Sequence, residues 1–187
     1  MILIFDTETT GIPPLNQKGK GYLPAKDFLA WNDCRLVELA WVVCNAMGGI
    51  IKQKEYIIKP KYFIIPEEST AIHKITHEEA KLKGAKIEMV LKEFLEDLEQ
   101  CDLLVGHNLA FDYQVVLAEL YRMGIENDKY NTIEKYCTML HGATPETTWP
   151  RLPDLYKRIF QTKPPYPLHR AINDVLICKD IYFYQAI

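Results

Sequence analysis

The chain has 187 residues, of which 48% are apolar and 25% charged. These proportions are typical of a globular protein with a substantial core, and they exclude a largely disordered chain. The formal net charge of −3 argues against a uniformly basic nucleic-acid binder, although a local basic patch could still bind phosphates.

The predicted elements begin with a short apolar strand over residues 1–8, which we expect to be buried on both faces. Residues 12–34 are rich in Pro, Gly and Lys and predict a long irregular excursion. Two strands are then predicted at 35–45 and 50–59. The segment Met47-Gly48-Gly49 between them predicts a hairpin whose glycines supply the positive φ of the turn.

Helices and strands alternate in the rest of the chain. Thr76 and Glu79 have the spacing of a capping box, and residues 87–100 carry an apolar stripe at helical spacing. The later predicted elements are a buried strand at 102–106, a helix from about Leu109 to Met123 that ends at Gly124, a strand within 131–139, a short helix at 152–160 and a last helix at 170–186.

This order predicts an α/β fold, with one mixed sheet and helices packed on its faces. No repeat, low-complexity tract or second domain is visible, so we expect residues 1–187 to form a single domain. In such sheets, functional side chains gather where strands end and helices begin. Acidic residues at those places are therefore the candidates for a site.

Three acids lie at such places. Asp6 and Glu8 are two residues apart at the end of the first strand, so their side chains point to one face. Asp112 lies in the first turns of a helix that follows Asn108, a candidate N-cap residue. Each position also has an ordinary explanation, because acids are common where a strand reaches solvent and are favoured by the helix dipole at a helix start.

Asp174 is harder to explain structurally. It is in helical register with Ala171, Cys178 and Ile181, a row that should face the core. A buried carboxylate must be partnered or neutralised, because its desolvation costs more than one helix can offset. Arg170, four residues earlier, is one candidate partner, and a metal ion is the other.

If the four acids meet at one edge of the sheet, their mutual repulsion requires cations. An all-oxygen cluster suits Mg²⁺ or Mn²⁺, and a pair of such ions about 4 Å apart is the clamp used for phosphodiester hydrolysis. His169 follows a proline-rich segment and should lie on the loop before the last helix, where a neutral imidazole could take a proton from water. The ordinary alternative is a surface histidine near a helix start.

Three segments in this order, FDTETTG (5–11), GHNLAFD (106–112) and HRAINDV (169–175), resemble the three exonuclease motifs of the DEDDh family. This family of 3′→5′ exonucleases includes the epsilon subunit of DNA polymerase III, RNase T and the TREX enzymes. AIHKIT (71–76) and RLPDLYKRIF (151–160) resemble further family segments, so the likeness extends over nearly the whole chain.

The resemblance implies a ribonuclease H-like fold, in which three antiparallel strands continue into a mixed five-stranded sheet. It implies that Asp6 bridges two metal ions, that Glu8 and Asp174 hold the ion that activates water, and that Asp112 supports the other. His169 would be the general base. The residues that match the pocket for the 3′-terminal nucleotide are Thr9, Thr10, Asn108 and Phe111; a turn, an N-cap and a core aromatic are the structural alternatives.

The implied function is a 3′→5′ exonuclease that uses two Mg²⁺ or Mn²⁺ ions and releases nucleoside 5′-monophosphates from a free 3′ end. We expect single-stranded DNA ends as substrate, with RNA as the alternative. A binding-only module of the same fold would not need all five chemical residues, and a proofreading subunit would need a DNA polymerase or a repair complex as partner. Late basic and aromatic residues could hold a single strand: Arg151, Lys157, Arg158, Lys163, Arg170, Trp149, Tyr156 and Tyr166.

The location of the protein is also an expectation from the sequence. The five cysteines are scattered and never form a CxxC pair, which favours a reduced, cytoplasmic protein. We expect no membrane span and no signal peptide, because long apolar runs and a basic N-terminal region are both lacking. The sequence departs from the family at Lys74, where glycine is common, at Cys137, where aspartate is common, and in a long link over 14–34.

Overall fold

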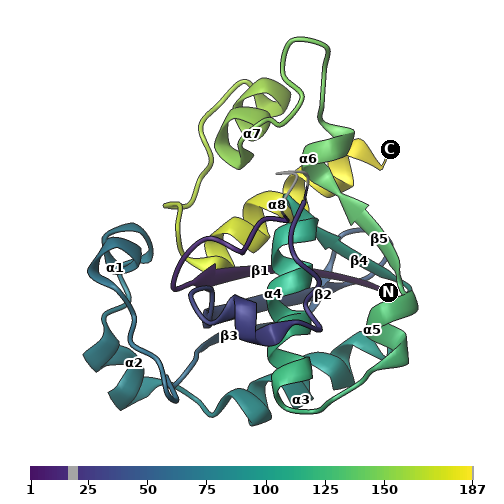
Figure 1. Ribbon diagram of the computed structural model, residues 1–187. Helices are drawn as coiled ribbons and strands as arrows, with labels where there is room; N and C mark the ends of the chain where they lie inside the picture. Colours follow the sequence, from purple (N-terminus) through teal and green to yellow (C-terminus); the bar gives the residue numbers. More distant parts are fainter. Residues whose placement is uncertain (17–20, 187) are drawn as a thin grey trace.

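The computed structural model describes residues 1–16 and 21–186, in which a five-stranded sheet carries helices on both faces (Figure 1). The strands are β1 (Ile2–Thr9), β2 (Leu36–Cys44), β3 (Ile50–Ile57), β4 (Leu103–Gly106) and β5 (Glu134–Cys137), in the spatial order β3-β2-β1-β4-β5. β2 runs antiparallel to both β1 and β3, whereas β4 runs parallel to both β1 and β5. The predicted mixed sheet of a ribonuclease H-like fold is confirmed.

The helices predicted from an apolar stripe are confirmed to within a few residues at each end. The helical elements are a 3₁₀ turn (Phe28–Trp31), α1 (Glu67–His73), α2 (His77–Lys83), α3 (Ile87–Leu98), α4 (Leu109–Arg122), α5 (Asp128–Thr132), α6 (Thr138–His141), α7 (Leu152–Phe160) and α8 (Ala171–Gln185). The 3₁₀ turn, α1, α5 and α6 are too short to show an apolar period, and the sequence did not predict them. Of the predicted excursion over 12–34, residues 17–20 lie outside the described residues.

Two turns test the predictions made from short stretches of the sequence. Thr76 Oγ1 accepts a hydrogen bond from the Glu79 N–H at 3.0 Å, as the capping-box spacing predicted. In the β2–β3 hairpin, only Gly48 has a positive φ, of 84°. Asn45 Oδ1 holds the rest of that turn by accepting bonds from Met47 N–H and Gly49 N–H, so the prediction that both glycines supply positive φ was wrong.

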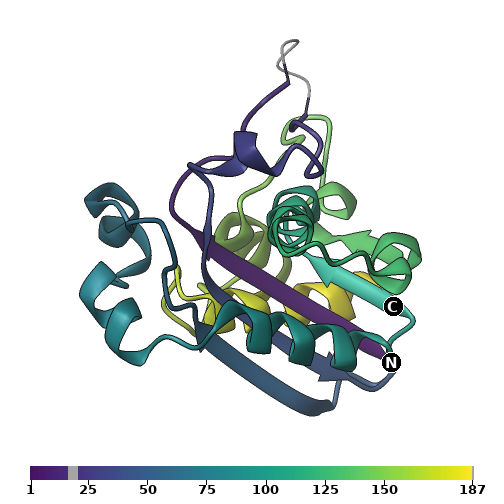
Figure 2. The ribbon, with the colours of Figure 1, turned by 60° about the horizontal axis from the view of Figure 1, so that its bottom comes forward.

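The two faces of the sheet bury separate cores, because side chains alternate along each strand. Leu3 and Phe5 of β1 face a cluster that includes residues of α3 and α4. Ile4, between them, faces a cluster formed with α7 and α8. Figure 2 shows α3 and α8 on opposite sides of the sheet. The α8 face of β1 is therefore the face on which Ile2, Ile4, Asp6 and Glu8 follow one another.

All five cysteines are free. Among the residues that the structure describes, no helix combines the length and apolarity needed to cross a bilayer.

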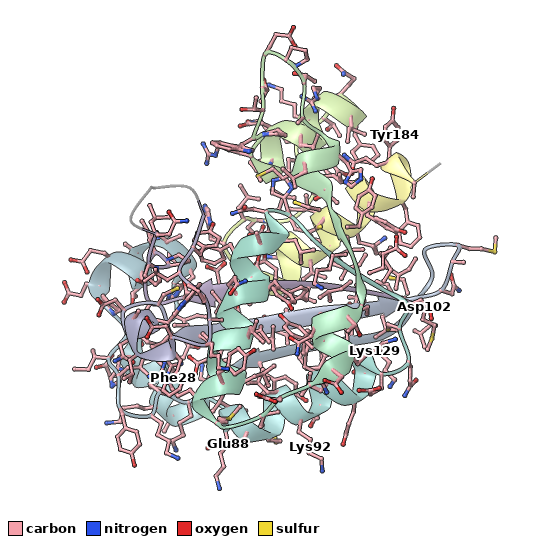
Figure 3. The ribbon with its side chains drawn as sticks, turned by 45° about the vertical axis from the view of Figure 1, so that its right-hand side comes forward. Phe28, Glu88, Lys92, Asp102, Lys129 and Tyr184 are labelled. Atoms are coloured by element: carbon pink, nitrogen blue, oxygen red, sulfur yellow. The ribbon has the colours of Figure 1, made fainter. Side chains whose placement is uncertain are left out.

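The packing of α3 depends on its apolar stripe. Glu88 and Lys92 lie on the outer side of α3 and point away from the sheet (Figure 3). Phe94, on the inner side, is fully buried and makes ring contacts with Phe5, Trp41 and Tyr130 at centroid distances of 5.4, 5.4 and 6.1 Å. This ring cluster ties α3 to the centre of the sheet.

We expect Phe94→Ala to lower the free energy of unfolding by about 3–5 kcal/mol, because it removes a buried ring and leaves a cavity among the others. Urea unfolding followed by circular dichroism measures the loss. The control is Leu82→Ala on α2, where the side chain is exposed, and we expect it to change stability by less than about 0.5 kcal/mol. A loss below about 1 kcal/mol for Phe94→Ala would contradict this view of the core.

Candidate active site

Three of the four predicted acids converge. One carboxylate oxygen from each of Asp6, Glu8 and Asp174 lies within 4.8 Å of the other two. Asp6 and Glu8 reach this point by continuing the row of Ile2 and Ile4 on the face of β1 that α8 covers. Asp174 reaches it because its row on α8 packs against the same face. Asp174, the charged residue in the core-facing row of α8, therefore lies over the polar end of β1.

Burial and mutual repulsion make these carboxyl groups weak acids. Burial, followed by the charges of Asp112, Asp174 and Glu8, raises the pKa of Asp6 well above its usual value. Burial and then the charge of Asp174 raise the pKa of Glu8 to about 8. Burial raises the pKa of Asp174 to about 6, although a backbone hydrogen bond from His169 acts in the opposite direction. The site is thus built to receive positive charge.

Arg170 does not supply that charge. Its guanidinium pairs with Glu38 at 2.6 Å and with Glu55 at 2.8 Å, so the structure contradicts the alternative that Arg170 neutralises Asp174. Asp174 Oδ2 accepts a hydrogen bond from the His169 backbone N–H at 3.2 Å. In the part of the chain that the structure describes, Asp174 Oδ1 is buried without a hydrogen-bond partner. An unpaired buried carboxylate oxygen is what a metal ligand presents before the ion binds.

Asp112 lies beside this group and is held differently. Its Oδ1 accepts hydrogen bonds from Thr7 N–H at 3.0 Å and from Thr7 Oγ1–H at 2.6 Å. Burial raises the pKa of Asp112 to about 7, against the effect of these bonds from Thr7. The charge of Asp112 contributes the largest electrostatic effect on the pKa of Asp6. Asp112 is therefore a neighbour of the three converging acids and is not one of the three.

His169 lies on the turn before α8, as predicted, with an exposed side chain. Its backbone takes a left-handed conformation, with φ of +67°. A hollow of about 640 Å³ between α1 and this turn is lined by His169, Ile72 and Lys74, among others. Lys74 also has a positive φ, of 66°, at the C-terminal cap of α1, a conformation that explains why glycine suits this position.

The four predicted pocket residues differ in which of their polar groups already form hydrogen bonds. Thr9 Oγ1–H donates to Gly11 O at 2.8 Å. The Thr10 hydroxyl is occupied, because it donates to Asp33 O and accepts from Arg35 N–H.

The other two pocket residues lie near α4. Asn108 is the N-cap residue of α4, as predicted, but it has a left-handed φ of +58° and its side chain makes no capping hydrogen bond. Asn108 lines a hollow of about 800 Å³ together with Tyr113 and Trp149, whereas Phe111 packs edge-on against Tyr22.

Sequence reasoning missed Glu38. It is fully buried in β2, where it was read as part of an apolar run. A lone acid among nine buried strand residues could have marked it. Glu38 contributes to the raised pKa of both Glu8 and Asp174, so it belongs to the electrostatics of the site.

The predicted basic and aromatic residues do not all face solvent. Arg170 is paired with acids, and Tyr156 is buried. The exposed residues of the set are Arg151, Lys157, Arg158, Lys163, Trp149 and Tyr166, although Arg158 also donates a hydrogen bond to Gly142 O.

Comparison with known proteins identifies the family. The model of the exonuclease family that includes RNase T, described as "Exonuclease", matches residues 3–182. The chain belongs to this exonuclease family. It is a hydrolytic nucleic-acid exonuclease of the DEDDh type, with an acidic group suited to a divalent metal.

Solved exonuclease structures share the fold. One is Exonuclease X in complex with 5′ overhanging duplex DNA, with a TM-score of 0.66, 24% identity and coverage of 99% of this chain and 90% of that one. Another is E. coli Exonuclease I with a dA16 oligonucleotide, with a TM-score of 0.74, 16% identity and coverage of 98% and 40%. A third is a zinc-bound complex of E. coli Exonuclease I with single-stranded DNA, with a TM-score of 0.71, 18% identity and coverage of 98% of this chain and 39% of that one. The chain thus spans about 40% of the length of the Exonuclease I chains. A search of curated protein sequences finds no match.

The raised pKa of Glu8 has a measurable consequence in metal-free protein. An acid with a higher pKa in the folded state binds more protons when folded, so it stabilises the fold at low pH. For Glu8, that stability is present below the unfolded value of 4.5 and is lost as the pH rises through about 8. In EDTA, we therefore expect Glu8→Gln to raise the melting temperature relative to wild type, by an amount that grows between pH 5 and pH 8.5.

Differential scanning fluorimetry across this pH range measures the difference curve. Glu78→Gln, at an exposed position on α2, is the matched control and should follow the wild-type curve. A Glu8→Gln curve parallel to wild type at every pH would contradict the raised pKa.

Proposed function

We propose that this exonuclease hydrolyses phosphodiester bonds from the 3′ end of nucleic acid, with DNA as the preferred substrate, and releases nucleoside 5′-monophosphates. The observation that carries the proposal is the convergence of Asp6, Glu8 and Asp174 next to the turn that bears His169. We further propose that residues 1–187 act as one exonuclease domain.

The donor set fits two divalent cations, Mg²⁺ or Mn²⁺. All the candidate ligands are carboxylate oxygens, which these ions prefer. Asp6 would be shared by both ions, Glu8 and Asp174 would complete one site, and Asp112 would support the other. The two bound cations would lower the pKa of a bound water and would stabilise negative charge on the phosphate. The buried, unpaired Asp174 Oδ1 supports this assignment.

His169 would act as the general base. A neutral imidazole nitrogen takes a proton from the attacking water while the water oxygen bonds to phosphorus. The bond between phosphorus and the 3′ oxygen of the preceding nucleotide breaks, and that oxygen receives a proton. The products are a nucleoside 5′-monophosphate and a chain shortened by one nucleotide with a new 3′ hydroxyl. The exposed side chain of His169 leaves its ring accessible to substrate.

The terminal nucleotide would lie against Thr9, Thr10, Asn108 and Phe111. Thr10 would contribute only to the shape of the pocket, because its hydroxyl, its backbone N–H and its backbone oxygen all form hydrogen bonds within the protein. Beyond the terminal nucleotide, the exposed Arg151, Lys157 and Lys163 would attract phosphates, and Trp149, which is 73% exposed, would stack on an unpaired base. The DNA complexes of the structural neighbours support DNA as the first substrate to test.

The test of substrate and direction uses 5′-labelled single-stranded DNA, duplex DNA with a recessed 3′ end, and RNA of matched sequence, each with Mg²⁺ or EDTA. We expect a ladder of DNA products shortened from the 3′ end in Mg²⁺, no products in EDTA, and protection by a blocked 3′ terminus. Degradation of RNA alone would show that RNA, and not DNA, is the substrate. Activity that appeared only with an added polymerase would show that the protein is a proofreading subunit and not an autonomous enzyme.

We expect Asp174→Asn to lose at least about 100-fold in kcat, because it removes one negative ligand from the proposed cation site. Product release in Mg²⁺ and in Mn²⁺ measures the loss. Asp154→Asn, at an exposed position on α7, is the matched control and should retain activity within about 2-fold. Nucleotide release by Asp174→Asn equal to that of wild type would reject the assignment.

We expect His169→Ala to lower kcat by about 100- to 10,000-fold, the usual contribution of a general base. Its affinity for Mn²⁺ should stay within about 2-fold of wild type, because the imidazole is not a proposed ligand. Isothermal titration calorimetry and single-turnover kinetics measure the two quantities. A matching collapse of Mn²⁺ affinity would show that His169 acts through the metal site instead.

A further inference from the structure

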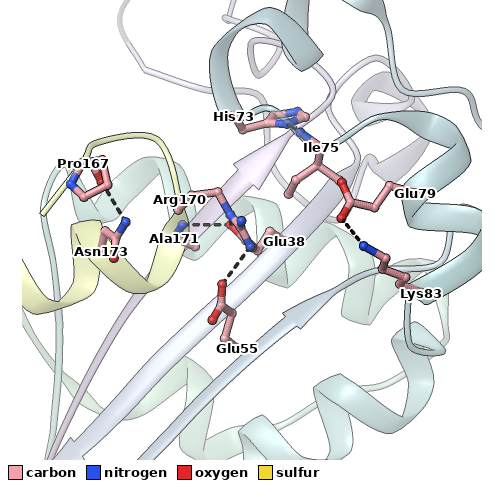
Figure 4. Close-up of polar contacts among 10 residues, drawn as sticks. All are labelled: Glu38, Glu55, His73, Ile75, Glu79, Lys83, Pro167, Arg170, Ala171 and Asn173. Carbon is pink, nitrogen blue, oxygen red and sulfur yellow. Dashed lines mark hydrogen bonds and ion pairs between the residues drawn. The ribbon is translucent and has the colours of Figure 1, made fainter.

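Glu38 and Arg170 form a clamp between the centre of the sheet and the turn before α8 (Figure 4). Arg170 Nη2 donates to Glu38 Oε1 at 2.6 Å, and Arg170 Nε donates to the two Glu38 oxygens at 3.0 and 3.3 Å. Arg170 Nη2 also donates to Glu55 Oε1 at 2.8 Å. The guanidinium is therefore paired with acids of two strands, β2 and β3, and among the described residues it forms no ion pair with Asp6, Glu8 or Asp174.

The same clamp fixes the first residue of α8. Glu38 Oε2 accepts a hydrogen bond from the Ala171 N–H at 2.8 Å, so one carboxylate holds both the side chain of Arg170 and the backbone after it. Glu38 is also the register partner of Glu8 across the β1–β2 pair. The start of α8 is thus tied to the strand position directly beside a candidate metal ligand.

His169 needs such support because its backbone is in an unfavourable conformation. A left-handed φ of +67° is unfavourable for a residue that carries a Cβ atom. The turn is held on one side by the bond from His169 N–H to Asp174 Oδ2 and on the other by the clamp. His169 is exposed, and the backbone of this turn sets the region that its imidazole can reach.

We propose that Glu38 and Arg170 are positioning residues that hold the imidazole of His169 at the converging carboxylates. This inference rests on the proposed function, in which His169 is the general base. An ion pair whose carboxylate is fully buried is weak evidence for a purely stabilising role, because desolvation of the carboxylate offsets much of the attraction. Arg170 is also poorly placed to bind phosphate, because its Nε and Nη2 donors are taken by acids.

The test compares Arg170→Lys, which keeps the charge and loses the planar fork, with Glu38→Gln, which keeps the shape of the side chain. Each should lower kcat by about 10- to 100-fold, the scale of a small misplacement of a reacting group. KM and Mn²⁺ affinity should stay within about 3-fold. The matched control is Arg122→Lys, which weakens another buried arginine–glutamate pair, with Glu119; it should lower the melting temperature and leave kcat within about 2-fold.

A mutant cycle with His169→Ala distinguishes positioning from general destabilisation. In the His169→Ala background, Arg170→Lys should change the residual kcat by less than about 2-fold, because no ring remains to be positioned. The same 10- to 100-fold loss in both backgrounds would overturn the clamp, as would a loss confined to KM or Mn²⁺ affinity. A wild-type rate for His169→Ala alone would instead reject the general base of the proposed function.

A structural readout tests the clamp without activity. In ¹³C-edited NMR spectra, Arg170→Lys should shift or broaden the ring resonance of His169. The resonance of His107 should not move, because that ring is held by Thr138 and Pro150 elsewhere in the structure. An unchanged His169 resonance in both clamp variants would overturn the inference.

Discussion

The mutual repulsion of three half-buried carboxylates is the constraint on which the site depends. Asp6, Glu8 and Asp174 are held within 4.8 Å of one another, where burial raises the free energy of their charged forms. In the described part of the chain, no lysine or arginine forms an ion pair with them. The fold keeps this arrangement because the strand and the helix that carry the acids are anchored by large apolar clusters. The stability of the core thus offsets the electrostatic repulsion among the three acids.

The topology explains how residues from opposite ends of the chain meet. β1 lies in the middle of the sheet, and its alternating side chains give one face to α3 and α4 and the other to α8. The apolar row on the α8 face becomes acidic as β1 ends. The clamp between Glu38 and Arg170 then holds the start of α8 and occupies the guanidinium of Arg170 with acids outside the converging group. This ion pair therefore leaves the three acids without an arginine partner and supports the turn of His169.

Much of this site could be predicted, because the side-chain periods of a strand and of a helix are enough to place three of its acids. Alternation along a strand places Asp6 and Glu8 on one face, and helical spacing places Asp174 on the buried row of α8. The predictions that failed concerned contacts between residues that are far apart in the sequence. Arg170 was one of two candidate partners for Asp174, four residues away, whereas its actual partner Glu38 is 132 residues away and is set by packing of α8 on β2. The occupied hydroxyl of Thr10 and the left-handed backbone of Asn108 likewise depend on tertiary contacts and on backbone conformation that no local pattern encodes.

The most direct test of the account is the position of Mn²⁺ in crystals of the protein, located by anomalous scattering. The account predicts an anomalous peak in contact with carboxylate oxygens of Asp6, Glu8 and Asp174, and the loss of that peak in Asp174→Asn crystals grown under the same conditions. Manganese bound elsewhere, or Asp174 closed onto a protein cation with no peak beside it, would contradict the claim that these three acids form a cation site.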